Sequence, residues 1–283
     1  MKKISVIIIF TLIGLNIFAK KNLPTPEEVK AFLKTKTLIV LEDNPMLEFN
    51  SEIQEAIKAN WIITEYSFIS TAEFLQAYKD PNYSFLLLNQ VIFQEDDNKP
   101  VYNYLSVWLG KDVADFEYLP EIVGVPLSYR SVDEENYIYK LGTIVRFIQN
   151  HIKLIADHPE LIKGNIFEYY NRNMGDIKTK TLYLVADDLD KNFNTAEKIK
   201  KVYPYKFKIT TRDDIQAAIE RGDEDCVFLH KIGPEGTRVE ARCYKIIVGA
   251  RDANFYYFDW HMINPNKPDG FLESDFKKIA KKK

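Results

Sequence analysis

The stretch Lys34-Thr35-Lys36-Thr37-Leu38 returns letter for letter, 144 residues later, as Lys178-Thr179-Lys180-Thr181-Leu182. The positions that follow each copy keep matching, at offsets that drift only between 139 and 144. A recurrence of this kind indicates a duplicated structural unit. Further matched positions are Asp43 with Asp187, Phe49-Asn50 with Phe193-Asn194, Ile69 with Ile209, Gln76-Ala77 with Gln216-Ala217, Phe85-Leu86 with Phe228-Leu229, and Tyr118 with Tyr257.

Each copy predicts the same order of elements, β-α-β-α-β-β-β, because short β-branched runs alternate with amphipathic helices before a final meander. The expected fold class is α/β (α+β), with two mixed sheets whose helices lie mainly on one face. In the first copy the strands are expected at 37–41, 65–69, 83–93 and 101–109, with a last strand that ends near Leu119. In the second copy they are expected at 181–185, 207–209, 226–232, 239–248 and 255–261.

The segment between the copies has no counterpart in the repeat. Ser131 and Glu134 have capping-box spacing, and apolar residues then follow at intervals of three and four. This predicts a long helix of about 25 residues, which either braces the two units or forms a coiled-coil dimer; bracing is the favoured interpretation. The apolar positions are Ile138, Leu141, Val145, Ile148, Ile152 and Ile155. We predict a first unit over 20–120, a helical connector over 121–177 and a second unit over 178–283.

The first nineteen residues have the layout of a secretory signal peptide. Lys2 and Lys3 precede the apolar run from Ile4 to Phe18, and Ala19 is a small residue at a plausible cleavage position. The run is short for a membrane span, although an uncleaved anchor is the alternative. We therefore expect an exported chain, periplasmic or extracellular, with outer-membrane association as an option and no transmembrane span in the mature chain.

The composition is that of an ordinary globular protein. The chain of 283 residues is 46% hydrophobic and 28% charged, with a formal net charge of −3. A protein that tracks nucleic-acid phosphates would carry a strong basic excess. Nucleic-acid binding is therefore not indicated.

Three aspartates follow the first strand of the two copies: Asp43, and the pair Asp187 and Asp188. Ligands of open α/β sheets gather at the carboxyl ends of strands, so these positions are candidates for a metal or phosphate site. No glycine-rich phosphate loop accompanies them, and aspartates also form turns and cap helices. The four histidines lack zinc-site spacing. We assign no catalytic residue, no metal ligand and no cofactor, and keep the aspartates as candidate binding residues.

The two cysteines, Cys226 and Cys243, pose a question of register. A two-residue loop Pro234-Glu235 would make them cross-strand neighbours and allow a disulfide in an exported chain. A three-residue loop that ends at Gly236 would send the two sulfurs to opposite faces. Both alternatives remain open from the sequence.

The aromatic run from Phe255 to His261 supplies two more candidate binding residues, Tyr256 and Trp260. Strict alternation would place them with Phe258 on one side of a strand. That side either binds a glycan or peptide by stacking or simply packs. The lysine-ended tail over 277–283 is either a solvated helix end or a contact for an anionic surface.

The strand Thr37-Leu38-Ile39-Val40-Leu41, then Phe49-Asn50, an amphipathic helix to Trp61 and the strand Tyr66-Ser67-Phe68-Ile69 resemble uncharacterised exported proteins of Gram-negative bacteria. More distantly, the half-repeat is similar to periplasmic α/β domains such as the TolB amino-terminal domain and the CsgG group. The resemblance covers about 35 residues of each copy. It implies a binding or scaffold role in the cell envelope and carries over no functional residue.

Three functional hypotheses follow. The first is a non-enzymatic exported protein that presents a groove or sheet edge to an envelope or outer-membrane-associated protein partner. The second is a metal-dependent hydrolase or transferase that uses the strand-end aspartates. The third is a small-molecule or glycan-binding protein that uses the cleft between the units. The sequence leaves the oligomeric state open.

Overall fold

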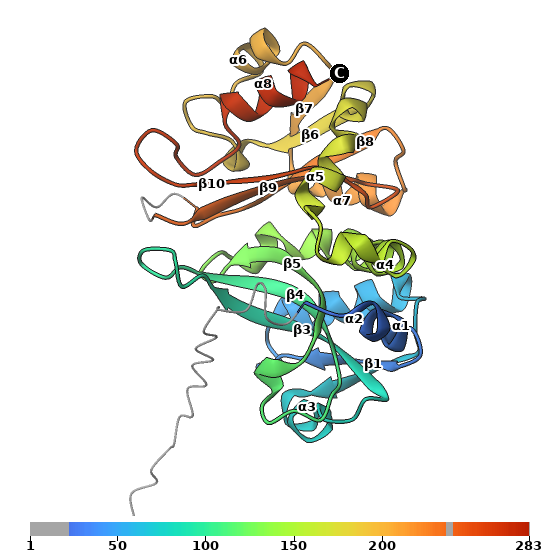
Figure 1. The fold of residues 1–283 in the computed structure, drawn as a ribbon. Coiled ribbons are helices and arrows are strands. Elements are labelled where there is room, and N and C mark those ends of the chain that lie inside the picture. Colours follow the sequence, from blue (N-terminus) through green and yellow to red (C-terminus); the bar gives the residue numbers. More distant parts are fainter. Residues whose placement is uncertain (1–22, 236–239, 283) are drawn as a thin grey trace, which may run out of the picture.

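The computed structural model describes residues 23–235 and 240–282. It contains two five-stranded mixed sheets, one above the other in Figure 1, with helix α4 (Leu141–Asp157) at the junction. The predicted signal peptide lies outside the described residues. Within these residues, no helix combines the length and the apolar character needed to cross a membrane.

The first unit begins with helix α1 and ends with strand β5. Its sheet has the order β2-β1-β3-β4-β5, in which β1 pairs in parallel with β2 and β3, and β4 and β5 then add antiparallel. The elements are α1 (Pro26–Phe32), β1 (Lys36–Leu41), α2 (Glu48–Asn60), β2 (Tyr66–Ser70), α3 (Thr71–Ala77), β3 (Tyr83–Ile92), β4 (Val101–Leu109), η1 (Phe116–Tyr118) and β5 (Glu121–Tyr129).

The second unit repeats this topology, since its sheet has the order β7-β6-β8-β9-β10, parallel and then antiparallel at the same positions. The predicted duplication and the α/β fold class are therefore confirmed. The elements are β6 (Thr181–Val185), η6 (Ala186–Asp188), α6 (Ala196–Val202), β7 (Phe207–Thr210), α7 (Arg212–Glu220), β8 (Cys226–Ile232), β9 (Arg242–Gly249), β10 (Phe255–Met262) and α8 (Glu273–Lys281).

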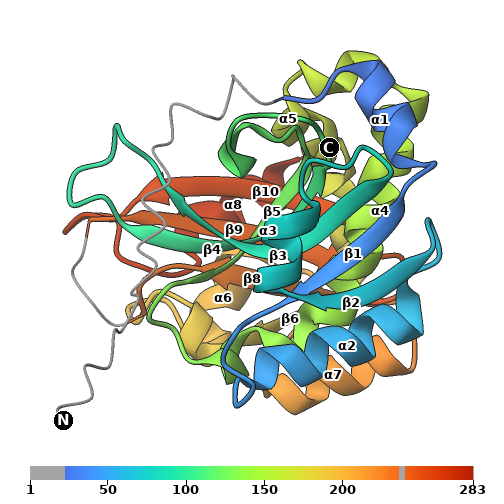
Figure 2. The ribbon, with the colours of Figure 1, turned by 90° about the horizontal axis from the view of Figure 1, so that it is seen from below.

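Helices cover both faces of each sheet, contrary to the expectation of a single covered face. Helices α1, α2, α4 and α7 contribute to one large core between the sheets. Helix α3 lies on the outer face of the first sheet, as Figures 1 and 2 show. It packs there through the buried side chain of Phe74. Helices α6 and α8 cover the outer face of the second sheet. The outer faces are apolar because the parallel strands are buried on both sides.

The last strand of the first unit lies later in the chain than predicted. Residues 116–118 form the short helix η1, and β5 runs from Glu121 to Tyr129, within the range that the sequence analysis gave to the connector. The rest of the connector consists of helix α4 and several shorter helical segments. They are η2 (Glu134–Asn136), η3 (Ile138–Lys140), α4, η4 (Pro159–Ile162), α5 (Ile166–Tyr170) and η5 (Asn171–Thr179).

Helix α4 is shorter than the 25 residues predicted, because its regular part has 17 residues and begins at Leu141. The backbone of Tyr137 leaves the helical region at φ −137°, and its side chain is buried. Tertiary packing thus divides the periodic stretch. The apolar stripe of α4 is buried within this chain, which confirms the bracing role and leaves no free seam for a coiled coil.

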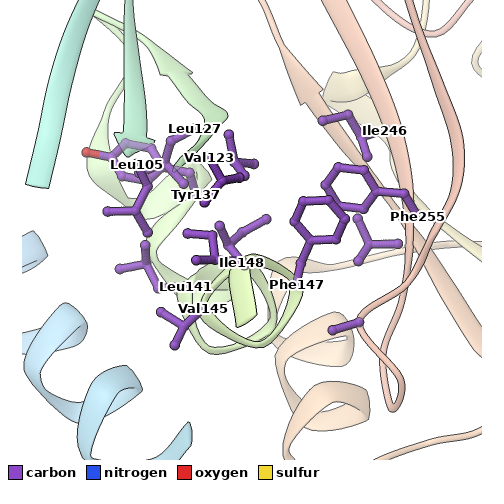
Figure 3. Packing of buried hydrophobic residues seen from close by; sticks show 14 of the residues in the cluster. Leu105, Val123, Leu127, Tyr137, Leu141, Val145, Phe147, Ile148, Ile246 and Phe255 are labelled. Atoms are coloured by element: carbon purple, nitrogen blue, oxygen red, sulfur yellow. The ribbon is translucent and has the colours of Figure 1, made fainter. Parts of the chain in front are cut away.

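Figure 3 shows how α4 contacts both units at once. Leu141, Val145 and Ile148 face the first unit, whereas the ring of Phe147 stacks on Phe255 of β10 with centroids 3.5 Å apart and planes 2° apart. The guanidinium of Arg146 donates hydrogen bonds to the carbonyls of Ala250 and Arg251 in the second unit. The amide of Gln149 accepts from Ile62 and Ile63 and donates to Asn60 in the first unit.

Neither predicted register of the β8–β9 hairpin is correct. Ile232 pairs with Tyr244, so the loop is longer than two or three residues. Cys226 lies opposite Ala250 at one end of the pair, whereas Cys243 lies at the other end. Both are buried free thiols, which excludes the disulfide.

Strand β10 carries a bulge at Tyr256, where the register shifts between Phe255 and Tyr257. The bulge breaks strict alternation. Phe255 and Phe258 consequently belong to the core beside α4, and Tyr256 packs with Tyr257 on the outer face. The predicted grouping of Tyr256 with Phe258 and Trp260 is therefore wrong.

Candidate functional site

The strand-end aspartates do not form one site. Asp43 and Asp187 are exposed and follow strands of different sheets, and Asp188 is buried. Among the described residues, no group of three histidine, cysteine, aspartate or glutamate side chains is arranged to hold a metal ion. Within the described residues, the aspartates therefore lack the additional ligands that the metal site considered from the sequence would need.

Asp188 lies among basic groups instead. Burial raises the pKa of its carboxyl, and the charges of Lys140 and Lys231 oppose that rise. Lys231 in turn forms a buried ion pair of 2.8 Å with Asp269. This cluster brings together buried charges of opposite sign from the connector and the second unit, which is the usual arrangement for buried ions that stabilise a fold.

The two aromatic candidates differ in exposure. The side chain of Tyr256 is 7% exposed, and its hydroxyl donates a 2.7 Å hydrogen bond to Asp252. Trp260 is 39% exposed and lies at the rim of a cleft between the two units.

This interunit cleft has a volume of about 460 Å³, and seven of its seventeen lining residues are aromatic. Its walls come from β3, β4 and β5 of the first unit, from α5 of the connector and from β9 and β10 of the second unit. Its lining residues are Asn89, Gln90, Val91, Phe93, Tyr104, Trp108, Glu117, Leu119, Glu121, Gly124, Pro126, Ile166, Phe167, Arg242, Tyr244, Phe258 and Trp260.

A second concavity of about 380 Å³, the α4-side groove, lies on the other side of β5. Its walls are largely aliphatic and come from β5, α4 and the turns before α5. Its lining residues are Leu23, Pro24, Glu121, Ile122, Val123, Gly124, Val125, Pro126, Phe147, His151, Ile155, Leu161, Ile162, Lys163, Gly164, Ile166, Tyr170, Phe255 and Phe258.

The imidazole of His151, which lines the α4-side groove, is neutral at physiological pH. His151 shares a 2.7 Å hydrogen bond with the hydroxyl of Tyr170. Burial lowers the pKa of His151 to about 4. The groove is thus apolar, with Lys163 as its one basic side chain.

Strand β5 separates the two concavities and is the edge strand of its sheet. Val123 and Val125 line only the α4-side groove, whereas Gly124 and Pro126 line both spaces. Ile166 and Phe258 also line both. The two spaces therefore meet along the edge of β5.

The edge of β5 turns backbone polar groups outward. The carbonyl of Pro126 faces away from β4, because it lies 3.1 Å from Nε2 of His230 in the second unit. Alternate residues of a strand direct N–H and C=O to the same side, and the register from Val123 to Pro126 is regular. The N–H and C=O of Gly124 consequently face outward too, and no other described element hydrogen-bonds to them.

Gly124 also makes room for a carboxyl group. A Cβ at this position would lie 2.4 Å from Oε1 of Glu121, which in turn accepts a 2.7 Å hydrogen bond from Ser106. Burial raises the pKa of Glu121, and hydrogen bonds from Ser106 and Trp108 partly oppose that rise. The carboxyl group of Glu121 thus lines both concavities. Its burial disfavours the charged form of this carboxyl group.

The charge at the far wall of the cleft is already compensated. The guanidinium of Arg242 donates to both carboxylate oxygens of Asp96, at 2.7 and 2.8 Å. Its carbon lies 3.7 Å from the ring centre of Phe93 and 4.7 Å from that of Trp260. This arrangement joins the β3–β4 hairpin to the second unit and neutralises the guanidinium of Arg242.

The equivalent edge of the second unit is closed. Phe258 of β10 donates its backbone N–H to Asn171 at 2.8 Å, and its carbonyl accepts from the same side-chain amide at 2.9 Å. Asn173 donates to the carbonyl of Phe255 at 3.1 Å. These asparagines of η5 pair with β10 as a neighbouring strand would.

Comparison with models of known protein families, with curated proteins and with solved structures finds no match for this chain. The resemblance stated from the sequence consequently remains a prediction. Sequence reasoning selected Trp260 but missed Glu121 and Gly124. Their only sequence signal was a glycine inside a β-branched run, which marks a close approach of another group.

Proposed function

We propose that the protein is a binding protein that recognises an extended segment of a partner polypeptide along the free edge of β5. The contrast between two equivalent edges carries this proposal: Asn171 pairs with the edge of β10, whereas Gly124 of β5 faces outward between two concavities. An exposed strand edge is a template for β-augmentation. In that mode main-chain hydrogen bonds supply affinity and pockets for alternate side chains supply specificity.

The two concavities define the side chains that the partner would present. Successive residues of an added strand point to opposite faces of the sheet. One would enter the α4-side groove, where Ile155 and Ile162 favour an aliphatic group. The next would enter the interunit cleft, where Tyr104 and Trp108 favour an aromatic or flat group.

The electrostatics favour uncharged side chains at both positions. Arg242 is neutralised by Asp96, and burial raises the pKa of the Glu121 carboxyl. Burying an unpaired charge from the partner in either space would cost more than burying an apolar group. The predicted signal peptide implies that the partner is an exported or envelope protein.

The aromatic lining supports a second candidate, a small neutral ligand such as a sugar held in the interunit cleft. Sugars stack on rings like that of Trp260, and amides such as Asn89 and Gln90 bind hydroxyl groups. Such a ligand would not need the outward N–H of Gly124. This difference separates the two candidates.

The test compares Gly124→Pro with Gly124→Ala. Both variants place a Cβ against Glu121, but only proline removes the outward N–H and occupies the edge with its ring. The probe is a dodecapeptide selected on the wild-type protein from a phage-displayed random library, then synthesised and measured by calorimetry. We expect selected peptides with adjacent aliphatic and aromatic residues.

We expect Gly124→Pro to weaken binding of that peptide by about tenfold, which corresponds to about 1.4 kcal/mol and to the loss of roughly one hydrogen bond. Gly124→Ala should stay within about threefold of the wild type. Circular dichroism checks that both variants fold. Failure to enrich any peptide, or unchanged binding by Gly124→Pro, would overturn the proposal.

A further inference from the structure

The two units differ greatly in charge although they share a fold. Residues 23–129 carry 17 acidic and 7 basic side chains, a formal charge of −10. Residues 178–283 carry 17 acidic and 21 basic side chains, a formal charge of +4. The net charge of −3 therefore conceals a strongly polarised molecule.

The excess of lysine in the second unit gathers on α6 and α8. These helices pack against each other on the outer face of the second sheet, at the end of the molecule away from the first unit (Figure 1). Their buried side chains, such as Ile199, Phe276 and Ile279, face the sheet, so the lysines project into solvent. We call these lysines, together with the neighbouring Lys206 and Lys282, the lysine face: Lys198, Lys200, Lys201, Lys206, Lys277, Lys278, Lys281 and Lys282.

About half of the lysine face is not neutralised by a carboxylate of the chain. Lys201, Lys277 and Lys278 form ion pairs with Glu197, Glu273 and Asp259. Within the described part of the chain, the ammonium groups of Lys200, Lys206, Lys281 and Lys282 have no carboxylate within 4.0 Å. The face therefore has a net positive charge that is available to an anionic surface.

We infer that the lysine face docks the protein on a membrane surface rich in anionic phospholipid headgroups. Clustered lysines are attracted to such a surface, and each contributes roughly a fivefold change in partition. The negative charge of the first unit would be repelled, so the same polarity orients the molecule with α6 and α8 toward the lipid. The edge of β5 lies at the junction of the units and would remain accessible.

The pattern fits a lipid surface better than a nucleic acid. Apart from the half-buried Tyr205, the rings next to these lysines, those of Tyr203, Tyr257 and Phe276, are buried. Single-stranded nucleic acids, in contrast, are held by exposed stacking platforms. Headgroup phosphates spread over a plane need only many mobile ammonium groups. Docking depends on the lysine face alone and is independent of the proposed peptide site.

The experiment uses residues 20–283, which include every described element and omit the predicted signal peptide. Co-sedimentation is measured with vesicles of phosphatidylglycerol and phosphatidylcholine at 30:70, and with pure phosphatidylcholine. We expect binding to the anionic vesicles alone, with a steep loss between 50 and 300 mM NaCl because salt screens exposed charges.

Two matched variants locate the contact. The first replaces Lys200, Lys206, Lys281 and Lys282 by glutamine, and the second replaces Lys30, Lys34, Lys36 and Lys79, exposed lysines of the first unit, so both lose four charges. We expect the first variant to bind anionic vesicles at least tenfold more weakly and the second to stay within about twofold of the wild type. Equal binding to both kinds of vesicle, no binding to either, or equal losses in the two variants would overturn the inference.

Discussion

Strands β5 and β10 are the corresponding edge strands of the two units. The outer edge of β5 is largely unpaired, whereas the outer edge of β10 is covered by side chains of η5. Asn171 pairs with both backbone groups of Phe258, so β10 gains a substitute for a neighbouring strand. Strand β5 has one such contact, from His230 to Pro126, and its preceding residues border the two concavities. A duplicated unit can therefore keep its sheet topology and still differ in how its edge is finished, which is where recognition becomes possible.

Phe147 joins the two edges, so its removal should have the largest effect. It lines the α4-side groove next to β5 and stacks on Phe255 of β10. Phe147→Ala should lower the free energy of unfolding by about 3–5 kcal/mol, as is usual for a buried phenylalanine. Urea denaturation measures this loss.

Phe167→Ala is the control for that variant. Phe167 is only partly buried, and its ring centre lies 4.4 Å from that of Phe258. A loss of about 1 kcal/mol is expected there, because less apolar area leaves the core. Equal losses in the two variants would show that α4 does not hold the edges together.

Removing the side chain of Asn171, which covers the edge of β10, should lower stability less than removing that of Phe147. Asn171→Ala leaves the N–H and C=O of Phe258 without their partner, which should cost about 2 kcal/mol. Hydrogen exchange at the amide of Phe258 should become faster. Asn173→Ala removes one hydrogen bond and should cost about 1 kcal/mol; unchanged exchange at Phe258 in Asn171→Ala would mean that another group closes this edge.

The smallest effect concerns the protonation of the Glu121 side chain beside the edge of β5. Because burial raises the pKa of Glu121, its contribution to stability is complete below the ordinary pKa of 4.5 and is lost as the pH rises through the folded-state pKa. Glu121→Gln imitates the neutral carboxyl, so the variant should be more stable than the wild type at neutral pH. The difference should disappear toward pH 4, and a variant that is less stable at neutral pH would contradict the neutral carboxyl.

The sequence predicted the duplicated topology because both copies preserve the periodicity of buried strands and amphipathic helices. It failed where tertiary contacts override local pattern. The buried side chain of Tyr137 ends the helical geometry before α4, and the bulge at Tyr256 reverses the faces of the residues on either side of it. A bulge has no sequence signal in a run of aromatic residues. The expectation that successive residues alternate between the two faces was therefore wrong here.

The candidate site was harder to predict than the fold. Strand ends drew attention to Asp43, Asp187 and Asp188, but two of these are solvent-exposed and the third is compensated by lysines. Glu121 and Gly124 were selected because they lie beside the edge of β5. That edge forms only when the sheet is complete and the second unit has packed beside it. Such positions are defined by long-range assembly, which spacing along one chain does not encode.

The place of α4 in the chain has a consequence for biogenesis. When synthesis has passed Asp157, the first unit and α4 are complete, but Phe255 and the rest of β10 are made near the end. Until then the ring of Phe147 lacks its stacking partner Phe255 and can contact only earlier residues such as Tyr170. The nascent chain therefore passes through a stage in which this apolar helix face is only partly covered, and transiently exposed apolar surface of this kind favours aggregation.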